Sequence, residues 1–115
     1  MDQEAFNSAT FKELQDTTGA EFVAELVQSF LEEAPQMRQT LFEAYAAQDA
    51  VGFRRAAHSI KTNAHTFGAF RLYGMARELE LGGLPVPGAA GRAALDQLTS
   101  VFQEAEQILR GQCNA

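Results

Sequence analysis

The sequence predicts an all-α protein, an antiparallel up-down four-helix bundle with a short additional N-terminal helix. Apolar residues recur at intervals of three and four along nearly the whole chain, which is the spacing of one helix face. No stretch alternates apolar and polar residues as a β-strand does, and short connections between the helical stretches favour antiparallel neighbours. At 115 residues the chain has the length of one domain, which we assign to residues 1–115.

Two helices are predicted in the N-terminal part of the chain. The first is short, has Asn7 or Ser8 as its N-cap, and stops at residues 17–19. The second spans about 20–48. Pro35 lies inside it and removes one backbone donor, so we expect a single helix bent near this residue, with two helices joined there as the alternative.

Three further helices are predicted after the second. Asp49 is a suitable N-cap for a helix over about 50–66, and the next helix spans about 69–82. Glycine and proline residues mark 82–88 as a linker. The last helix carries an apolar stripe over residues 95–109, which completes the four long helices of the bundle.

The composition excludes several classes of function. With 46% hydrophobic and 21% charged residues, the chain resembles an ordinary globular protein. Its net charge of −6 disfavours binding to nucleic acid or to an anionic membrane surface, and no apolar run reaches the roughly 20 residues that span a bilayer. Cys113 is the sole cysteine, which excludes an internal disulfide and a cysteine-based zinc site. The acidic N-terminus does not resemble a signal peptide, and we expect a cytoplasmic protein.

The basic residues are concentrated in one part of the chain, residues 50–77, which we call the basic segment. It contains no acidic residue but holds five of the nine basic ones, which are Arg54, Arg55, Lys61, Arg71 and Arg77. On a chain with a net charge of −6, this distribution predicts a positive region on an otherwise negative surface.

Within the basic segment, His58 is predicted to point to water. One face of this helix collects the apolar residues of a core-facing stripe, which are Phe53, Ala56, Ala57, Ile60, Ala64 and Phe67. His58 lies on the opposite face, with Arg54 and Lys61 one turn before and after it. We expect these cations to favour the neutral, nucleophilic imidazole and to suit a negatively charged product on the ring, such as a phosphoryl group.

The stretch 57–69 resembles the signature of histidine-containing phosphotransfer (Hpt) domains. That signature has a phosphoacceptor histidine followed by an aliphatic residue at +2, lysine at +3, a small residue at +4, glycine at +10 and leucine at +14. The matching residues here are His58, Ile60, Lys61, Thr62, Gly68 and Leu72. The pair Leu79–Glu80 matches a later Leu-Glu pair of the family, and the proline-containing second helix and the four-helix layout are similar too.

The resemblance implies a phosphocarrier in a phosphorelay, without enzymatic activity of its own. His58 would take a phosphoryl group on Nε2 from the aspartate of one receiver domain and pass it to the aspartate of another. Lys61 would offset the charge of the phosphoryl oxygens. The Mg²⁺ and the acidic cluster for the transfer belong to the receiver, so the chain itself is expected to need no cofactor or metal. The sequence has no nucleotide-binding glycine motif, which argues against self-phosphorylation from ATP.

A receiver domain is expected to dock around His58. The positive charge of Arg54 and Arg55 would attract its acidic cleft, and Val51 and Phe70 would form an apolar rim. Because the reactive face must stay exposed, we expect a monomer.

Three more positions near the histidine are assigned to the partner surface. Thr62 is a small residue beside His58 that leaves room for the partner's loops, although glycine is common there in the family. Gly68 lets the chain turn closely into the next helix. His65 stands where the family usually has a small residue, and it is a polar surface residue, a docking contact or a second acceptor.

Three other functions compete with this interpretation. A regulatory adaptor bundle, which binds a receiver or a kinase without being phosphorylated, stays open. The dimerisation and phosphoacceptor domain of a sensor kinase is disfavoured, because an acidic residue follows the histidine in that family and Ser59 follows His58 here. A haem or di-metal bundle is disfavoured because its ligands would face the core, whereas both histidines are predicted to face outward.

Overall fold

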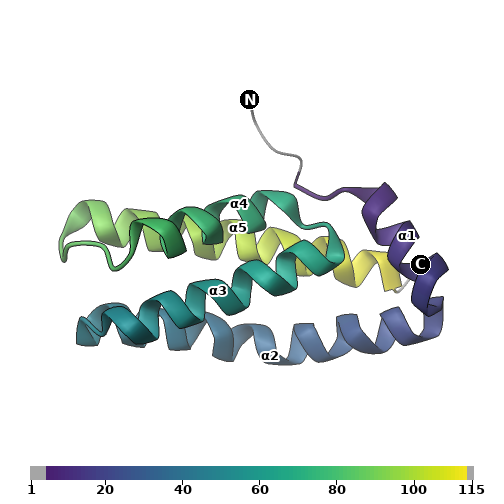
Figure 1. Cartoon of the computed structure of the whole chain (residues 1–115), viewed down its shortest axis with the longest axis horizontal. Helices are drawn as coiled ribbons and strands as arrows, with labels where there is room; N and C mark the ends of the chain where they lie inside the picture. The colour runs from purple at the N-terminus through teal and green to yellow at the C-terminus, as the bar shows by residue number, and fades with distance from the viewer. Residues whose placement is uncertain (1–4, 114–115) are drawn as a thin grey trace.

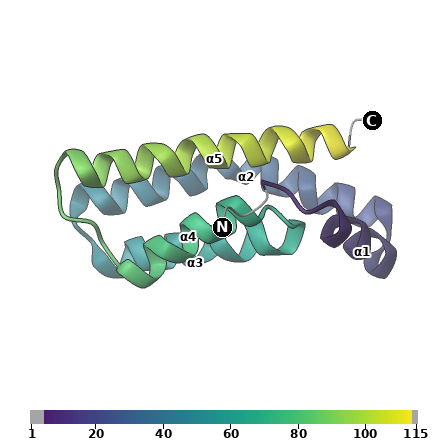
Figure 2. The ribbon, with the colours of Figure 1, turned by 90° about the horizontal axis from the view of Figure 1, so that it is seen from above.

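The structure is a computed structural model that describes residues 5–113, and within them the chain consists of helices and their connections (Figure 1). The helices are α1 (Ser8–Thr18), α2 (Ala20–Ala47), α3 (Ala50–Phe67), α4 (Phe70–Gly82) and α5 (Ala89–Cys113). The four longer helices run up and down as a bundle, and α1 lies at the end of the bundle where α5 finishes (Figures 1 and 2). The predicted fold class is confirmed.

The second helix is continuous through its proline. Pro35 lies inside α2 and has no N–H to donate to the carbonyl of Leu31. Because Pro35 is exposed, this carbonyl is on a side of the helix that water can reach. The apolar face of α2 is buried before and after this point, for example at Phe30 and Leu41. The prediction of one helix is therefore confirmed, and the alternative of two helices joined at Pro35 is wrong.

Two helices begin at side chains that the sequence predicted as N-caps. Oδ1 of Asn7 accepts a hydrogen bond from the backbone N–H of Thr10 at 2.9 Å. Oδ1 of Asp49 accepts one from the backbone N–H of Gly52 at 3.0 Å. Each cap satisfies a donor that the first helical turn leaves without a partner in the helix.

The core is built from the predicted apolar faces. The six residues assigned to the stripe of α3 are all buried, and so are the main residues of the stripe of α5, which are Leu95, Leu98, Phe102, Ala105 and Leu109. This packing determines how each helix is rotated about its axis, and so which side chains reach solvent. No helix in the described part of the chain combines the length and the apolar character needed to cross a membrane.

Two ion pairs that the sequence did not predict connect α5 to the rest of the bundle. Arg38 on α2 pairs with Glu106, and its guanidinium also lies 5.3 Å from the centre of the Phe102 ring. Arg71 on α4 pairs with Glu104 at 2.8 Å. These contacts neutralise charges at the edges of the apolar core.

The turn between α3 and α4 is held by glycine and by the N-terminal segment. Gly68 has φ +80°, and its carbonyl accepts a hydrogen bond from the backbone N–H of Asn7 at 2.8 Å. Gly68 is buried under this segment, so the expectation that it contacts a partner is wrong. Its contribution is to the turn, because only glycine adopts this backbone conformation without strain.

Gly68→Ala is expected to destabilise the fold. The added methyl group would lie 2.8 Å from the carbonyl oxygen of Asn7, and φ is in the left-handed region. We expect the free energy of unfolding, measured by urea denaturation, to fall by about 2 kcal/mol. Gly111→Ala is the control, because the methyl group added there would point into open space. This variant should match or exceed the wild type in stability. A Gly68→Ala protein as stable as the wild type would contradict this account of the turn.

Candidate functional site

His58 stands in the middle of α3 with its ring in solvent. Its side chain is 59% exposed, whereas Ala57 beside it and Ile60 two residues later are buried in the core. Because these apolar neighbours determine the rotation of α3, the imidazole is directed away from the bundle. The predicted exposure of His58 is confirmed.

A carboxylate from the neighbouring helix contacts this ring. Oε2 of Glu80, on α4, lies 2.8 Å from Nδ1 of His58, and Oε1 of the same carboxylate lies 2.6 Å from Nζ of Lys61. Glu80 thereby connects the two residues that the sequence predicted as the reactive pair. Arg54 and Lys61 lie one turn before and after His58 on α3, as predicted, but the charged group in contact with its ring is an anion from α4, which the sequence did not predict.

The charges of this group of three side chains depend on one another. The ammonium of Lys61 lowers the pKa of Glu80, partial burial opposes the shift, and the hydrogen bond with His58 adds to it. The side chains of Lys61 and Glu80 are each 24% exposed, so water screens this pair less than a pair on the open surface. Glu80 is therefore ionised at neutral pH.

The contact at Nδ1 determines the chemistry of the other ring nitrogen. A carboxylate accepts hydrogen bonds but donates none, so in the neutral ring Nδ1 of His58 carries the proton and donates to Oε2 of Glu80. The lone pair is then on Nε2. The arrangement presents an oriented nucleophilic nitrogen on a ring that shares the carboxylate of Glu80 with the ammonium group of Lys61.

Sequence reasoning matched Glu80 to a family position but gave it no role. The signal that could have found it is the α3–α4 hairpin, since His58 and Glu80 are equally far from Ala69 in the turn between the two helices. Residues at equal distances from such a turn lie side by side in an antiparallel helix pair. Glu80 lies outside the basic segment, residues 50–77, so the charge pattern of that segment does not indicate it.

The other residues predicted to contact a partner lie around His58. Those on α3 are all exposed, and they are Val51, Arg54, Arg55, Thr62 and His65. Phe70, at the start of α4, is half-buried. The hydroxyl of Thr62 donates to the backbone carbonyl of His58 at 3.0 Å, so Thr62 holds its side chain against its own helix.

His65 packs with two aromatic residues of α4, and we call these three residues the aromatic cluster. Its ring centre lies 5.2 Å from that of Tyr73 and 6.0 Å from that of Phe70. The two aromatic rings of α4 are 6.4 Å apart. Within residues 5–113, no carboxylate contacts His65 as Glu80 contacts His58. The surroundings of the two histidines therefore differ, although both lie on the same face of α3.

The cations of the basic segment divide into two groups. Lys61 and Arg71 are neutralised by acids, from α4 and α5 respectively. Arg54, Arg55 and Arg77 form no ion pair with any residue that the structure describes. The positive surface near His58 is therefore carried by these three arginines.

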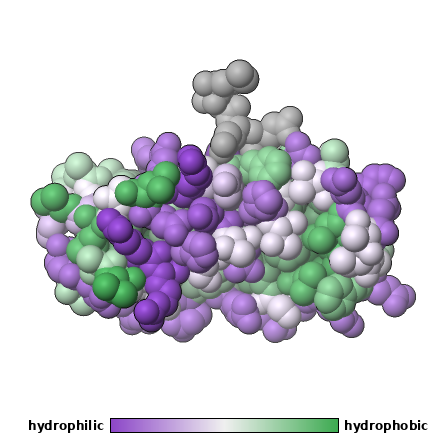
Figure 3. All heavy atoms as spheres, in the orientation of Figure 1, coloured by the Kyte–Doolittle hydropathy of each residue, from purple (hydrophilic) through white to green (hydrophobic). Residues whose placement is uncertain are grey.

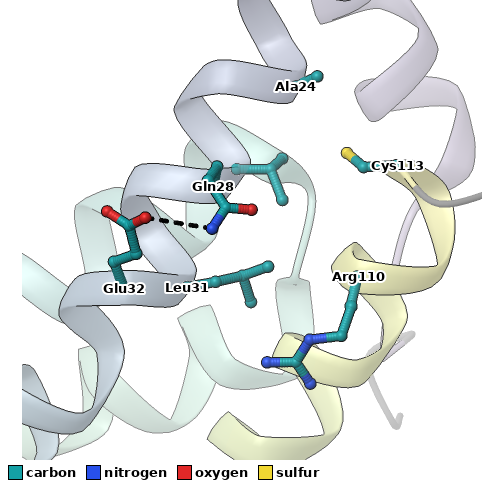
Figure 4. A pocket seen from close by; sticks show the side chains of 7 residues that line it. Ala24, Gln28, Leu31, Glu32, Arg110 and Cys113 are labelled. Carbon is teal, nitrogen blue, oxygen red and sulfur yellow. Dashed lines mark hydrogen bonds between the residues drawn. The ribbon is translucent and has the colours of Figure 1, made fainter.

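The described part of the chain has no competing metal site. Residues 5–113 contain no group of three His, Cys, Asp or Glu side chains that could hold a metal ion. A pocket between α2 and α5 is lined by residues that include Arg110 and Cys113 (Figure 4), but these two helices carry none of the site residues. Burial raises the pKa of the Cys113 thiol, which disfavours its reactive thiolate form.

Comparison with known proteins agrees with this fold. The sequence model of the Hpt domain matches residues 25–100, a segment that contains α3 and α4 in full. The fold is similar to the crystal structure of histidine-containing phosphotransfer protein B from Pseudomonas aeruginosa PAO1, with a TM-score of 0.80 and 21% sequence identity over 98% of this chain and 97% of that one. No curated protein matches the chain.

The Lys61–Glu80 pair is expected to make stability depend on pH in the acid range. Because the pKa of Glu80 is lowered by folding, its ionised form stabilises the fold above the ordinary value of 4.5, and this contribution is lost as the pH falls through the lower folded-state pKa. Urea denaturation from about pH 7 to about pH 3 should therefore show wild type more stable than Glu80→Gln near neutrality, with the difference shrinking in acid.

Glu78→Gln is the control for this experiment, because it removes an exposed carboxylate from the same helix that has no ion pair with a described residue. A difference between wild type and Glu80→Gln that stays constant down to about pH 3 would contradict the role of the pair. The same holds if Glu78→Gln reproduces the pH-dependent loss.

Proposed function

Because the chain belongs to the Hpt domain family, whose members are phosphocarriers of two-component phosphorelays, we propose that it carries a phosphoryl group on Nε2 of His58. The observation that supports this assignment most is the 2.8 Å contact between Nδ1 of His58 and the carboxylate of Glu80. This contact favours the tautomer with a free Nε2, and it distinguishes His58 from His65.

The proposed transfer requires no proton to move at His58. The lone pair of Nε2 attacks the phosphorus of an aspartyl phosphate, an N–P bond forms, and the P–O bond to the aspartate breaks, so the aspartate leaves as a carboxylate. Nδ1 keeps its proton, and the ring takes up a positive charge. The carboxylate of Glu80 stabilises that charge because it already accepts the hydrogen bond from Nδ1.

The second transfer reverses these steps with another receiver. A carboxylate oxygen of its aspartate attacks the phosphorus, the N–P bond breaks, and the bonding electrons return to Nε2 of His58. Neutral imidazole is regenerated with its proton still on Nδ1 and still donated to Glu80. The same hydrogen bond therefore serves both directions of transfer.

Lys61 supplies positive charge next to the transferred group. An ammonium group has three donors, and one of them suffices for the contact with Oε1 of Glu80. The others can turn to the phosphoryl oxygens, whose charge must be offset while phosphorus is shared between two nucleophiles. Lys61 is therefore proposed to lower the barrier to transfer in both directions.

We propose that the donors and acceptors are receiver domains of response regulators and of hybrid sensor histidine kinases, since Hpt domains exchange phosphoryl groups with receivers. The receiver would bring the Mg²⁺. We also propose that the chain does not phosphorylate itself from ATP, because the sequence has no nucleotide-binding glycine motif. A cytoplasmic location and a monomeric state stay predictions.

Incubation with phosphorylated receiver domains tests the assignment of His58. Label should move to the wild-type chain in an acid-labile, alkali-stable form, and His58→Gln should abolish it. His65→Gln is the matched control, because it alters the other exposed histidine on the same face of α3, and it should still accept label. Label retained by His58→Gln would assign the chemistry to another residue. No label from a broad panel of receivers would favour the regulatory adaptor instead.

Lys61→Ala and Glu80→Gln should slow transfer without unfolding the bundle. We expect a loss of about tenfold to a hundredfold in rate for each, since Lys61→Ala removes the charge proposed to face the phosphoryl oxygens and Glu80→Gln removes the charge that stabilises the ring through Nδ1. Glu80 is a positioning residue, so Glu80→Gln should also shift the ¹⁵N resonances of His58 towards a mixture of tautomers. Wild-type rates for Lys61→Ala, with an unchanged melting temperature, would remove Lys61 from the mechanism. Glu78→Gln should change neither the rate nor the resonances.

A further inference from the structure

We propose that a receiver domain reaches His58 from the α4 side of α3, with its acidic cleft over Arg54 and Arg77 and an apolar element on the aromatic cluster. This inference rests on the proposed function and adds the side of α3 from which the receiver docks. On its other side, α3 is flanked by α2, which offers a different surface. Charge and position distinguish the two sides, and the α3–α4 side also exposes apolar residues.

Most of the positive charge that has no ion pair with a described residue lies on α3 and α4. Five of the nine basic residues pair with acids, in the pairs Lys12–Asp16, Arg38–Glu106, Lys61–Glu80, Arg71–Glu104 and Arg92–Asp96. Four have no ion pair within residues 5–113, which are Arg54, Arg55, Arg77 and Arg110. Three of these four lie on the two helices that build the site, where Glu78 is the one acid that has no ion pair with a described residue. A phosphorylation cleft that binds Mg²⁺ through carboxylates is attracted to such a surface.

The flank formed by α2 has the opposite sign. A groove between α2 and α3 runs beside Ser59, the neighbour of His58, and Glu33 lines it together with uncharged residues. Glu43 is exposed one turn beyond Thr40, another lining residue, on the same face of α2. An acidic cleft placed over this groove would meet like charge, which disfavours approach from this side.

Apolar side chains are also exposed on the α3–α4 side. The aromatic cluster lies towards the C-terminal end of α3, and Val51 and Leu81 are exposed towards the other end, at 68% and 67%. Arg54 packs close to Gly83, which brings the end of α4 next to the first turns of α3. Figure 3 shows hydrophobic and strongly hydrophilic side chains next to each other at this end of the molecule. Exposed apolar residues bordered by arginine are typical of docking surfaces.

These features are continuous with the reactive nitrogen. Arg54 lies one turn before His58, and Glu80, which contacts the ring, lies between Arg77 and Leu81 on α4. A receiver centred on the α3–α4 pair therefore covers the arginines, the ring and the aromatic cluster together. A receiver centred on the α2 groove would leave Arg77 and the aromatic cluster uncovered.

The first test uses a receiver domain that transfers label to the wild-type chain. Arg77→Gln should lower kcat/KM for transfer about fivefold at low ionic strength with kcat unchanged, and the loss should shrink as salt is added. Arg110→Gln is the matched control, because it makes the same charge change at another arginine that has no ion pair with a described residue, on α5. It should transfer label like the wild type.

The second test maps the surface directly. On titration of the ¹⁵N-labelled chain with the same receiver, amide resonances around Tyr73 and Arg77 should shift, and those around Gln36 and Thr40 should not. Shifts centred on α2, or equal transfer by Arg77→Gln and Arg110→Gln, would overturn this direction of docking while transfer to His58 stands. If no receiver labels the wild-type chain, the proposed function is wrong, and the proposed docking surface is wrong as well.

Discussion

The burial of one face of α3 is the constraint on which the site depends. Phe53 and Ile60 are completely buried, and burial of a side chain of this size stabilises the fold by roughly 1.5–3 kcal/mol. A partly exposed ion pair such as Lys61–Glu80 contributes less, because water screens the attraction between its charges. The apolar contacts therefore decide the rotation of the helix, and the ionic contacts orient a ring that the core has already directed outward.

The α3–α4 hairpin adds the second requirement, which is register. Glu80 meets His58 only if the two helices are aligned along their length, and the turn at Gly68 sets that alignment. A hydrogen bond from the backbone N–H of Asn7, at the start of α1, to the carbonyl of Gly68 holds this turn. The short N-terminal helix thus supports the site from a distance, although it contributes no side chain to it.

For the surface around the site, the local distribution of charge matters more than the net charge of the chain. The chain has a net charge of −6, yet its unpaired arginines lie mainly on the two helices that form the site. The Pseudomonas aeruginosa protein has a similar fold at 21% identity. A bundle is specified mainly by apolar spacing, which tolerates many different surface residues.

The sequence by itself determined the helices, the caps at Asn7 and Asp49, the buried stripe of α3 and the exposure of His58. Each of these depends on residues within a few positions of one another. Over such short distances, the period of the helix determines which side chains share a face. The contact of Glu80 with the ring and the burial of Gly68 under the N-terminal segment were decided only by the tertiary structure. They join residues from different helices, and spacing within one helix carries no information about the group that a neighbouring helix places opposite it.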